Sequence, residues 1–328
     1  MTARRRGVQL TPMETRREVI LATARLADEL GYEVFAMPEG WGLDSTAVLA
    51  EIALATRRIA IASGVLSVWG RTPATLAMTA ATLHDISRGR YVLGLGAGTK
   101  ALAEGFHDVP FTRPAAKLRD STTKVRALLA GERARLTGAT ATRPLPLGRP
   151  PIPDLPIWLA AMGSRTLAVT AELADGWLPV FVAAERLAGW AEDLRRTRRP
   201  VGDRPLTVAA GPMAIADRDA GAARQVAATY AAWYLCAMGD VYPRLVTRQG
   251  YGAALQAVRA ANPKPSPRHG DVPAEAQVVL DQFTAYGAPG RIGEQLERWS
   301  PAADIVMIGL APGLPWNAIE ATLRAAAP

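Results

Sequence analysis

A strand–helix–strand pattern in the first third of the chain constrains the fold most strongly. Ile59–Leu66 and Tyr91–Gly96 are short apolar runs typical of buried strands, and Pro73 begins a helical pattern between them. Two buried strands that run in one direction and are joined by a helix form a parallel unit. Such units bind ligands at the carboxyl ends of their strands, so Gly64 and Gly98 should open on the same face.

The same alternation continues along the whole chain. Eight apolar runs are separated by helical patterns: Gly7–Leu10, Glu33–Pro38, Ile59–Leu66, Tyr91–Gly96, Pro156–Ala160, Gly176–Val180, Leu206–Ile215 and Asp304–Gly309. Eight strands alternating with helices are typical of a (β/α)8 TIM barrel, whereas a doubly wound sheet usually has fewer. We therefore predict an α/β protein, with a single TIM-barrel domain over residues 1–328.

Two segments interrupt this alternation, after the fourth and the seventh predicted strands. Residues 132–154 are rich in proline, glycine and arginine, which indicates an extended surface loop. Residues 239–274 hold a helical pattern at Val241–Ala261, followed by a proline-rich stretch. Insertions between a barrel strand and its helix commonly cover the active face, so the second segment is a candidate lid.

Composition excludes several classes of protein. The chain is 49% hydrophobic and 21% charged, the balance of a folded globular protein. It has no apolar run of about 18 residues, as a membrane span would need, and its first residues lack the apolar core of a signal peptide. The single cysteine, Cys236, excludes an internal disulfide. We expect a cytoplasmic protein without a membrane partner.

The net charge of +8 indicates an anionic partner. The arginine clusters at Arg4–Arg6 and Arg195–Arg199 are short and lack interleaved aromatic residues, which argues against nucleic acid. A small molecule that carries phosphate or several negative charges fits better. The three histidines are scattered without ligand spacing, so we predict no metal site.

The glycines of Gly94–Gly98 admit two interpretations. They hint at a dinucleotide-binding fingerprint, but Pro110 and Pro114 delay the helix that should follow at once. The glycines either let one stretch of chain pass close to another or let a flat ring lie against the backbone.

Taken together, several segments make the chain resemble the bacterial luciferase-like superfamily. Within it, the chain is most similar to the branch that uses the deazaflavin coenzyme F420, which includes methylenetetrahydromethanopterin reductase. The segments that carry this resemblance are Ala27–Tyr32, Pro38–Trp41, Ser63–Ser67, Arg71–Leu83, Arg88–Gly98, Leu155–Gly163 and Ala174–Trp177.

The resemblance implies a set of cofactor contacts. It implies a backbone bulge with a non-proline cis peptide bond at Gly64–Val65, behind the middle ring of the deazaflavin. The residues that it assigns to the cofactor are Glu39, Gly64, Val65, Ser67, Ala97, Gly98, Thr99, Met162, Gly163, Arg165 and Thr166. The last four match the stretch that receives the phosphate. There the residues themselves agree, because a glycine before a serine-capped helix exposes free N–H groups to an anion and Arg165 adds charge.

The chain also departs from the pattern of this branch. Sugar-phosphate dehydrogenases of this group carry a histidine and a glutamate where this chain has Gly40 and Thr99, so a sugar-phosphate substrate becomes doubtful. Glu39 matches the acidic position and is a candidate catalytic residue; the alternative is a solvated loop carboxylate. Glu104 and His107 follow the fourth strand and could supply a proton or simply lie at the surface.

Three aromatic residues are candidates for a substrate pocket. Trp41, Trp69 and Phe106 follow predicted strands and could wall a site for an apolar substrate. The alternative is that such tryptophans only pack.

These observations together predict an oxidoreductase that transfers a hydride between F420 and a small organic substrate. Reduction of a C=C or C=N bond needs only a hydride and one acid, which fits a site without the histidine–glutamate pair. One alternative is an FMN-dependent monooxygenase of the same fold, and another is a deazaflavin- or flavin-binding protein without catalysis. The resemblance also suggests a homodimer.

Overall fold

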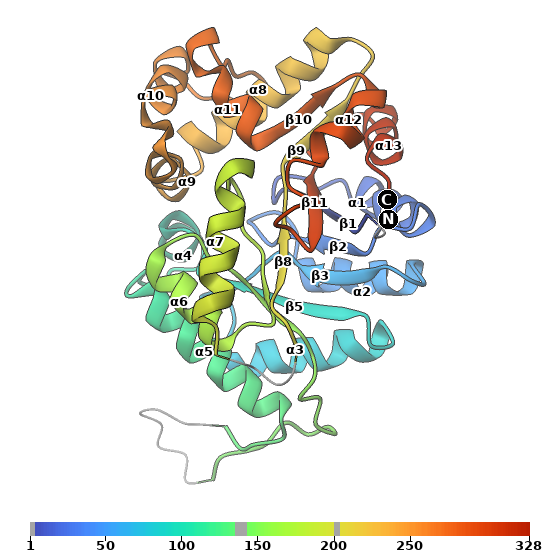
Figure 1. Ribbon diagram of the computed structural model, residues 1–328. Coiled ribbons are helices and arrows are strands. Elements are labelled where there is room, and N and C mark those ends of the chain that lie inside the picture. The colour runs from blue at the N-terminus through green and yellow to red at the C-terminus, as the bar shows by residue number, and fades with distance from the viewer. Residues whose placement is uncertain (1–3, 135–142, 200–203) are drawn as a thin grey trace.

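The computed structural model describes residues 4–134, 143–199 and 204–328, whose centre is a closed barrel of eight parallel strands (Figure 1). The strands follow one another around the barrel in chain order, and the last pairs with the first. They are β1 (Arg6–Gln9), β2 (Val34–Met37), β3 (Ala60–Ser63), β5 (Tyr91–Gly96), β6 (Ile157–Ala160), β7 (Gly176–Trp177), β8 (Thr207–Ala210) and β11 (Ile305–Gly309). The predicted TIM barrel is confirmed.

Helices cover the outside of the barrel, and the sequence marks where several of them begin. The Asp44 carboxylate accepts a hydrogen bond from the Thr46 N–H at 2.9 Å, and the Thr72 hydroxyl accepts one from the Thr75 N–H at 3.1 Å, immediately before Pro73. The covering helices are α1 (Arg17–Glu29), α2 (Ser45–Ala55), α3 (Pro73–Ile86), α5 (Pro114–Leu129), α6 (Ser164–Leu173), α7 (Ala184–Thr197), α12 (Pro289–Leu296) and α13 (Trp316–Ala325). The short helix α4 (Lys100–Gly105) instead follows the carboxyl end of β5.

The side chains of Met307 and Trp158 lie in the barrel interior, each over a glycine of a neighbouring strand. A Cβ atom on Gly7 would lie 2.3 Å from the Met307 sulfur, and one on Gly176 would lie 2.3 Å from the Trp158 ring. The other members of this inner cluster are Val34, Ala36, Ala62, Val92, Leu178, Ala209 and Ile305. Because the interior is packed, a ligand can bind only at an end of the barrel.

The prediction of one strand at Leu206–Ile215 is wrong, because the run divides into β8 and β9 (Met213–Ala216). Pro212 has no N–H for a ladder, and a Cβ atom on Gly211 would lie 2.0 Å from the Met307 carbonyl oxygen. Beyond this break, β9 leaves the barrel and pairs with β10 (Thr284–Gly287), a strand that we did not predict.

The segment between β9 and β10 is a group of helices on one side of the barrel, drawn in yellow to orange in Figure 1. It consists of α8 (Ala220–Cys236), α9 (Val241–Val246), a π-helical turn (Thr247–Tyr251), α10 (Gly252–Ala261), a 3-10 turn (Ala274–Ala276) and α11 (Gln277–Phe283). The prediction of one helix over Val241–Ala261 is therefore wrong. Gly250, with φ of 100°, interrupts it.

The predicted loop at residues 132–154 lies partly outside the described residues, which exclude 135–142. Its described ends pair through an isolated antiparallel bridge between Arg133 and Pro146. Across the described parts of the chain, no helix combines the length and the apolar character needed to cross a membrane.

The glycine at the β8–β9 break should be required for stability. We expect Gly211→Ala to lower the free energy of unfolding by about 1–3 kcal/mol, because the new methyl group would overlap the Met307 carbonyl. Gly189 is the matched control: it is exposed in α7, and a Cβ atom added there would have no neighbouring atom within 4 Å. Gly189→Ala should raise stability by about 0.5–1 kcal/mol in the same urea titration. Equal effects of the two variants would contradict this account.

Candidate functional site

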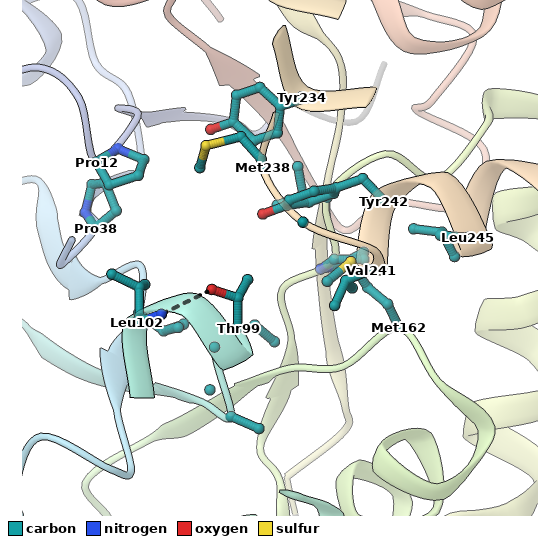
Figure 2. Close-up of a pocket in the computed structure, with 18 of the residues that line it drawn as sticks. Pro12, Pro38, Thr99, Leu102, Met162, Tyr234, Met238, Val241, Tyr242 and Leu245 are labelled. Carbon is teal, nitrogen blue, oxygen red and sulfur yellow. Dashed lines mark hydrogen bonds between the residues drawn. The ribbon is translucent and has the colours of Figure 1, made fainter. Parts of the chain in front are cut away.

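A cavity of about 1250 Å³ lies at the carboxyl ends of the barrel strands. Each barrel strand or the loop after it contributes to the wall, with Gln9, Glu39, Val65, Ala97, Met162, Pro179, Pro212 and Gly309 among the contributors. Helices α8 and α9 and the turn between them cover the opposite side, with Tyr230, Tyr234, Met238, Tyr242 and Leu245. The cavity therefore has a floor of barrel backbone and a roof from the β9–β10 segment (Figure 2).

The floor contains a bulge where β3 ends. The peptide bond between Gly64 and Val65 is cis, at the position that the family resemblance assigned. Backbone hydrogen bonds hold the bulge to β2, from Gly64 N–H to the Met37 carbonyl at 2.8 Å and from Glu39 N–H to the Val65 carbonyl at 3.3 Å. The chain then resumes pairing with β5 through β4 (Leu66–Ser67). The predicted strand Ile59–Leu66 is thus divided at Gly64 into β3 and β4.

The glycines of β5 make room for this bulge. A Cβ atom on Gly94 would lie 1.8 Å from the Ser63 carbonyl oxygen, and one on Gly96 would lie 2.5 Å from Val65. The Ser63 hydroxyl joins the two strands, because it accepts the Gly94 N–H at 2.8 Å and donates to the Gly94 carbonyl at 2.9 Å. Gly98 instead has open space around it and lines the cavity. The first interpretation of the glycines is therefore confirmed within β5, and the second stays a prediction for Gly96 and Gly98, which line the cavity.

Gly64 is itself confined by the fold. A Cβ atom there would lie 2.9 Å from the Cβ atom of Ala36 in the barrel interior. Any larger residue at position 64 would consequently disturb packing as well as the cavity floor, so a substitution there does not isolate ligand binding.

Glu39 forms a buried ion pair that the sequence analysis missed. Its carboxylate accepts a hydrogen bond from Arg71, and the two side chains are only 7% and 14% exposed. Arg71 also donates to Asp44 at 2.9 Å. Burial by itself would lower the pKa of Arg71, but the bond and charge of Glu39 outweigh it, so the pKa lies above its usual value. Glu39 lines the cavity as a paired carboxylate, which suits a hydrogen-bond acceptor better than a proton donor.

The start of α6 is the best place for an anion. Its cap is Gly163 and not the predicted Ser164, and the Thr166 hydroxyl accepts the Gly163 N–H at 3.2 Å. The first N–H groups of a helix have no partner within the helix and carry partial positive charge. Met162, Gly163, Arg165 and Thr166 all line the cavity here, as the resemblance implied.

A second arginine reaches this helix start from the roof. Arg248, in the π-helical turn, donates to the Met162 carbonyl, and its guanidinium lies 4.5 Å from the centre of the Trp190 ring. Arg248 is 83 residues from Arg165 in sequence, so no local pattern could have brought the two together.

Gln249 fastens the same turn to the barrel. The side chain is 2% exposed. Its amide accepts the Ala183 N–H at 2.8 Å and donates to the Phe181 carbonyl at 2.9 Å. Phe181 has φ of 58°, a backbone conformation that aromatic residues rarely adopt. The roof is therefore docked on the loop after β7 at this point.

Several predicted residues line the cavity and several do not. Trp41, Val65, Ala97, Gly98, Thr99 and Phe106 line it. Four others lie outside its wall: Ser67, Trp69, Glu104 and His107. The Ser67 hydroxyl accepts the Trp69 N–H at 3.2 Å, and the Trp69 indole donates to the Ala97 carbonyl at 2.7 Å. Trp69 thus supports the wall from behind, where its ring packs on Phe111.

The two predicted proton donors are engaged elsewhere. The Glu104 carboxylate accepts the Phe111 N–H at 3.1 Å and pairs with Lys100 at 3.4 Å. The His107 ring packs over Gly70, where a Cβ atom would come within 2.8 Å of it. Within the described residues, no three or more His, Cys, Asp or Glu side chains form a group that could hold a metal ion.

Loss of the Gln249 amide should loosen the roof. We expect Gln249→Leu to lower the free energy of unfolding by about 1–3 kcal/mol, because it leaves the Ala183 N–H and the Phe181 carbonyl buried without their partner. Chemical denaturation measures this loss, and limited proteolysis should show faster cleavage in the β9–β10 segment. Gln256→Leu, on the exposed face of α10, should leave both readouts unchanged. A stable, protease-resistant Gln249→Leu protein would refute the anchoring role.

Comparison with known proteins adds to this geometry. A family model described as luciferase-like monooxygenase matches residues 1–303. A Mycobacterium tuberculosis protein that bears the name of a coenzyme F420-dependent oxidoreductase is 28% identical over 333 residues, which cover 90% of each chain.

Two solved structures share the fold and differ in cofactor. The coenzyme F420-dependent tetrahydromethanopterin reductase from Methanopyrus kandleri superposes with a TM-score of 0.74 at 20% identity, over 97% of each chain. The oxygenating constituent of the 3,6-diketocamphane monooxygenase from Pseudomonas putida, solved with FMN, gives a TM-score of 0.64 at 16% identity, over 99% of each chain. At these identities the likeness concerns the fold alone.

Proposed function

Because the chain belongs to the luciferase-like monooxygenase family, we propose that it is an oxidoreductase that binds coenzyme F420 in the cavity. It would transfer a hydride between this cofactor and a small organic substrate, reducing a C=C or C=N bond. The observation that carries the proposal is that the β3 bulge and the start of α6 open into one cavity. The relative from Mycobacterium tuberculosis, which is named for F420, supports the choice of cofactor.

The residues present fit a flat ring system joined to a phosphate. Gly64, Val65, Ala97 and Gly98 offer a floor of backbone and small side chains. At the other end, free N–H groups at the start of α6 would bind the phosphate, with charge added by Arg165. Glu39 would accept a hydrogen bond from the ring system while Arg71 holds its carboxylate in place.

In this proposal the cofactor and the protein contribute different parts of the reaction. The reduced deazaflavin supplies the hydride when bound. The protein orients both reactants and excludes water with the apolar side chains of the roof. Thr99 does not replace the missing glutamate, because it has no carboxyl group and its hydroxyl accepts the Leu102 N–H at the start of α4.

An FMN-dependent monooxygenase is the second candidate function. FMN also joins a flat ring to a phosphate, and the structural neighbour from Pseudomonas putida contains it. The third candidate is a cofactor-binding protein without catalysis. A homodimer and a cytoplasmic location also belong to the proposal; the first rests on the family resemblance and the second on the lone cysteine.

Titration of the purified protein with each cofactor distinguishes these candidates. We expect F420 to bind more tightly than FMN, measured by the change in cofactor fluorescence. Submicromolar binding of FMN with no measurable binding of F420 would reverse the assignment. Tight binding of F420 without turnover of any unsaturated compound would favour the non-catalytic protein.

Arg165 should contribute to binding of the cofactor. We expect Arg165→Ala to weaken F420 binding by about 1–3 kcal/mol, the range for a hydrogen bond to a charged group. Arg218→Ala is the control, because Arg218 is exposed after β9 and lies outside this cavity. An unchanged dissociation constant for a folded Arg165→Ala protein would remove the residue from the site.

A further inference from the structure

Three tyrosines, Tyr230, Tyr234 and Tyr242, line the roof of the cavity, and two of them direct their hydroxyls into it (Figure 2). Tyr234 comes from α8 and Tyr242 from α9. Figure 2 shows both hydroxyls directed toward the space between Pro12, Pro38 and Thr99. No local sequence pattern marks them, and the cofactor contacts proposed above do not use them.

Packing fixes the position of both rings. Their centroids are 5.0 Å apart with planes at 75°, an edge-to-face arrangement. The Phe181 ring lies behind them, with its centroid 5.2 Å from that of Tyr234 and 5.5 Å from that of Tyr242. Because Gln249 holds the Phe181 backbone, the anchoring of the roof also positions the two hydroxyls.

The charged side chains that line the cavity are either paired or exposed to solvent. In the parts of the chain that the structure describes, the charged residues lining the cavity are Glu39, Arg113, Arg165, Arg244 and Arg248. Glu39 is neutralised by Arg71, and Arg248 is bound to the Met162 carbonyl beside α6. Arg113 and Arg244 are exposed. The other side chains labelled in Figure 2 are uncharged: Pro12, Pro38, Thr99, Leu102, Met162, Met238, Val241 and Leu245.

The Tyr234 hydroxyl shares a hydrogen bond with that of Tyr230, and it donates to a ligand when Tyr230 is the donor of that bond. The Tyr242 hydroxyl is suited to donate directly at neutral pH. Burial raises the pKa of Tyr242 to about 12 and raises that of Tyr234 well above its usual value. A buried donor without an acceptor is unfavourable, and so is a substrate charge without a counter-ion. The ligand that matches this surface is therefore uncharged, largely apolar, and carries an acceptor atom.

We propose that the substrate is an uncharged, largely apolar molecule whose reducible double bond is conjugated to a hydrogen-bond acceptor, and that the Tyr234 and Tyr242 hydroxyls hold this acceptor. The inference rests on the proposed function. The reduced deazaflavin, when bound, would supply the hydride, losing two electrons, and this hydride would form the new C–H bond at the far carbon of the double bond. The π electron pair would move toward the acceptor, whose negative charge the tyrosine hydroxyls stabilise by hydrogen bonds. A proton from water would then add to the near carbon, which gives the saturated product and restores the acceptor.

Three probes of nearly equal shape test the substrate class. Benzalacetone is a neutral conjugated ketone, trans-cinnamate replaces its methyl group with a charged oxygen, and 1-phenyl-1-butene lacks the acceptor. Calorimetry should show that benzalacetone binds at least tenfold more tightly than either of the others. Equal or tighter binding of cinnamate would overturn the uncharged class, and equal binding of phenylbutene would overturn the role of the acceptor. Binding of none of the three would overturn the proposal as a whole.

Phenylalanine variants test the hydroxyls while they keep the packed rings. Tyr234→Phe and Tyr242→Phe should each weaken benzalacetone binding about three- to tenfold and leave phenylbutene binding unchanged. Tyr251→Phe is the control, because its hydroxyl donates to Glu185 at 2.6 Å outside the cavity. Benzalacetone affinities that are unchanged in both folded variants would refute the assignment.

Measurements with and without cofactor separate this inference from the proposed function. If F420 does not bind, the proposed function fails, yet benzalacetone binding to the cofactor-free protein still reports on the tyrosines. If F420 binds as tightly to the phenylalanine variants as to the original protein while benzalacetone binding is weakened, the hydroxyls act on the substrate. A loss of F420 affinity equal to the loss for benzalacetone would place them on the cofactor and overturn the inference.

Discussion

The architecture of the site depends on one close approach of backbone to backbone, where the end of β3 lies against β5. Side chains at positions 94 and 96 would overlap Ser63 and Val65, so glycine at both positions is a steric requirement. The Ser63 hydroxyl then ties the strands together on both sides of Gly94. Beside this contact, the Gly64–Val65 bulge lies in the floor of the cavity. The chain then continues to Trp69, which supports the wall.

The roof is held to the barrel by a buried side-chain amide. Gln249 satisfies backbone groups of Phe181 and Ala183, and its neighbour Arg248 meets the Met162 carbonyl beside the start of α6. A π-helical turn, which often marks functional sites, brings both side chains to the barrel. The segment is docked at this point, so any opening of the cavity would have to bend the chain elsewhere.

The cavity is electrostatically divided. Positive charge and free N–H groups collect at the start of α6, whereas the roof presents tyrosine hydroxyls among apolar side chains. The only buried carboxylate among its described lining residues, Glu39, is neutralised by Arg71. The family of the chain fixes the fold, while this division of the cavity supports the proposals for cofactor and substrate.

The sequence by itself determined the barrel, because strand and helix periods and caps such as Asp44 and Thr72 are local signals. It also predicted part of the cavity wall, through motifs whose members are close in sequence. Tertiary structure alone decided which polar groups are free to act. Glu104 and His107 have suitable chemistry but are held outside the cavity, and partners that are distant in the chain neutralise Glu39 or add Arg248. A side chain's chemistry is local, but its partners and solvent access depend on contacts between distant segments.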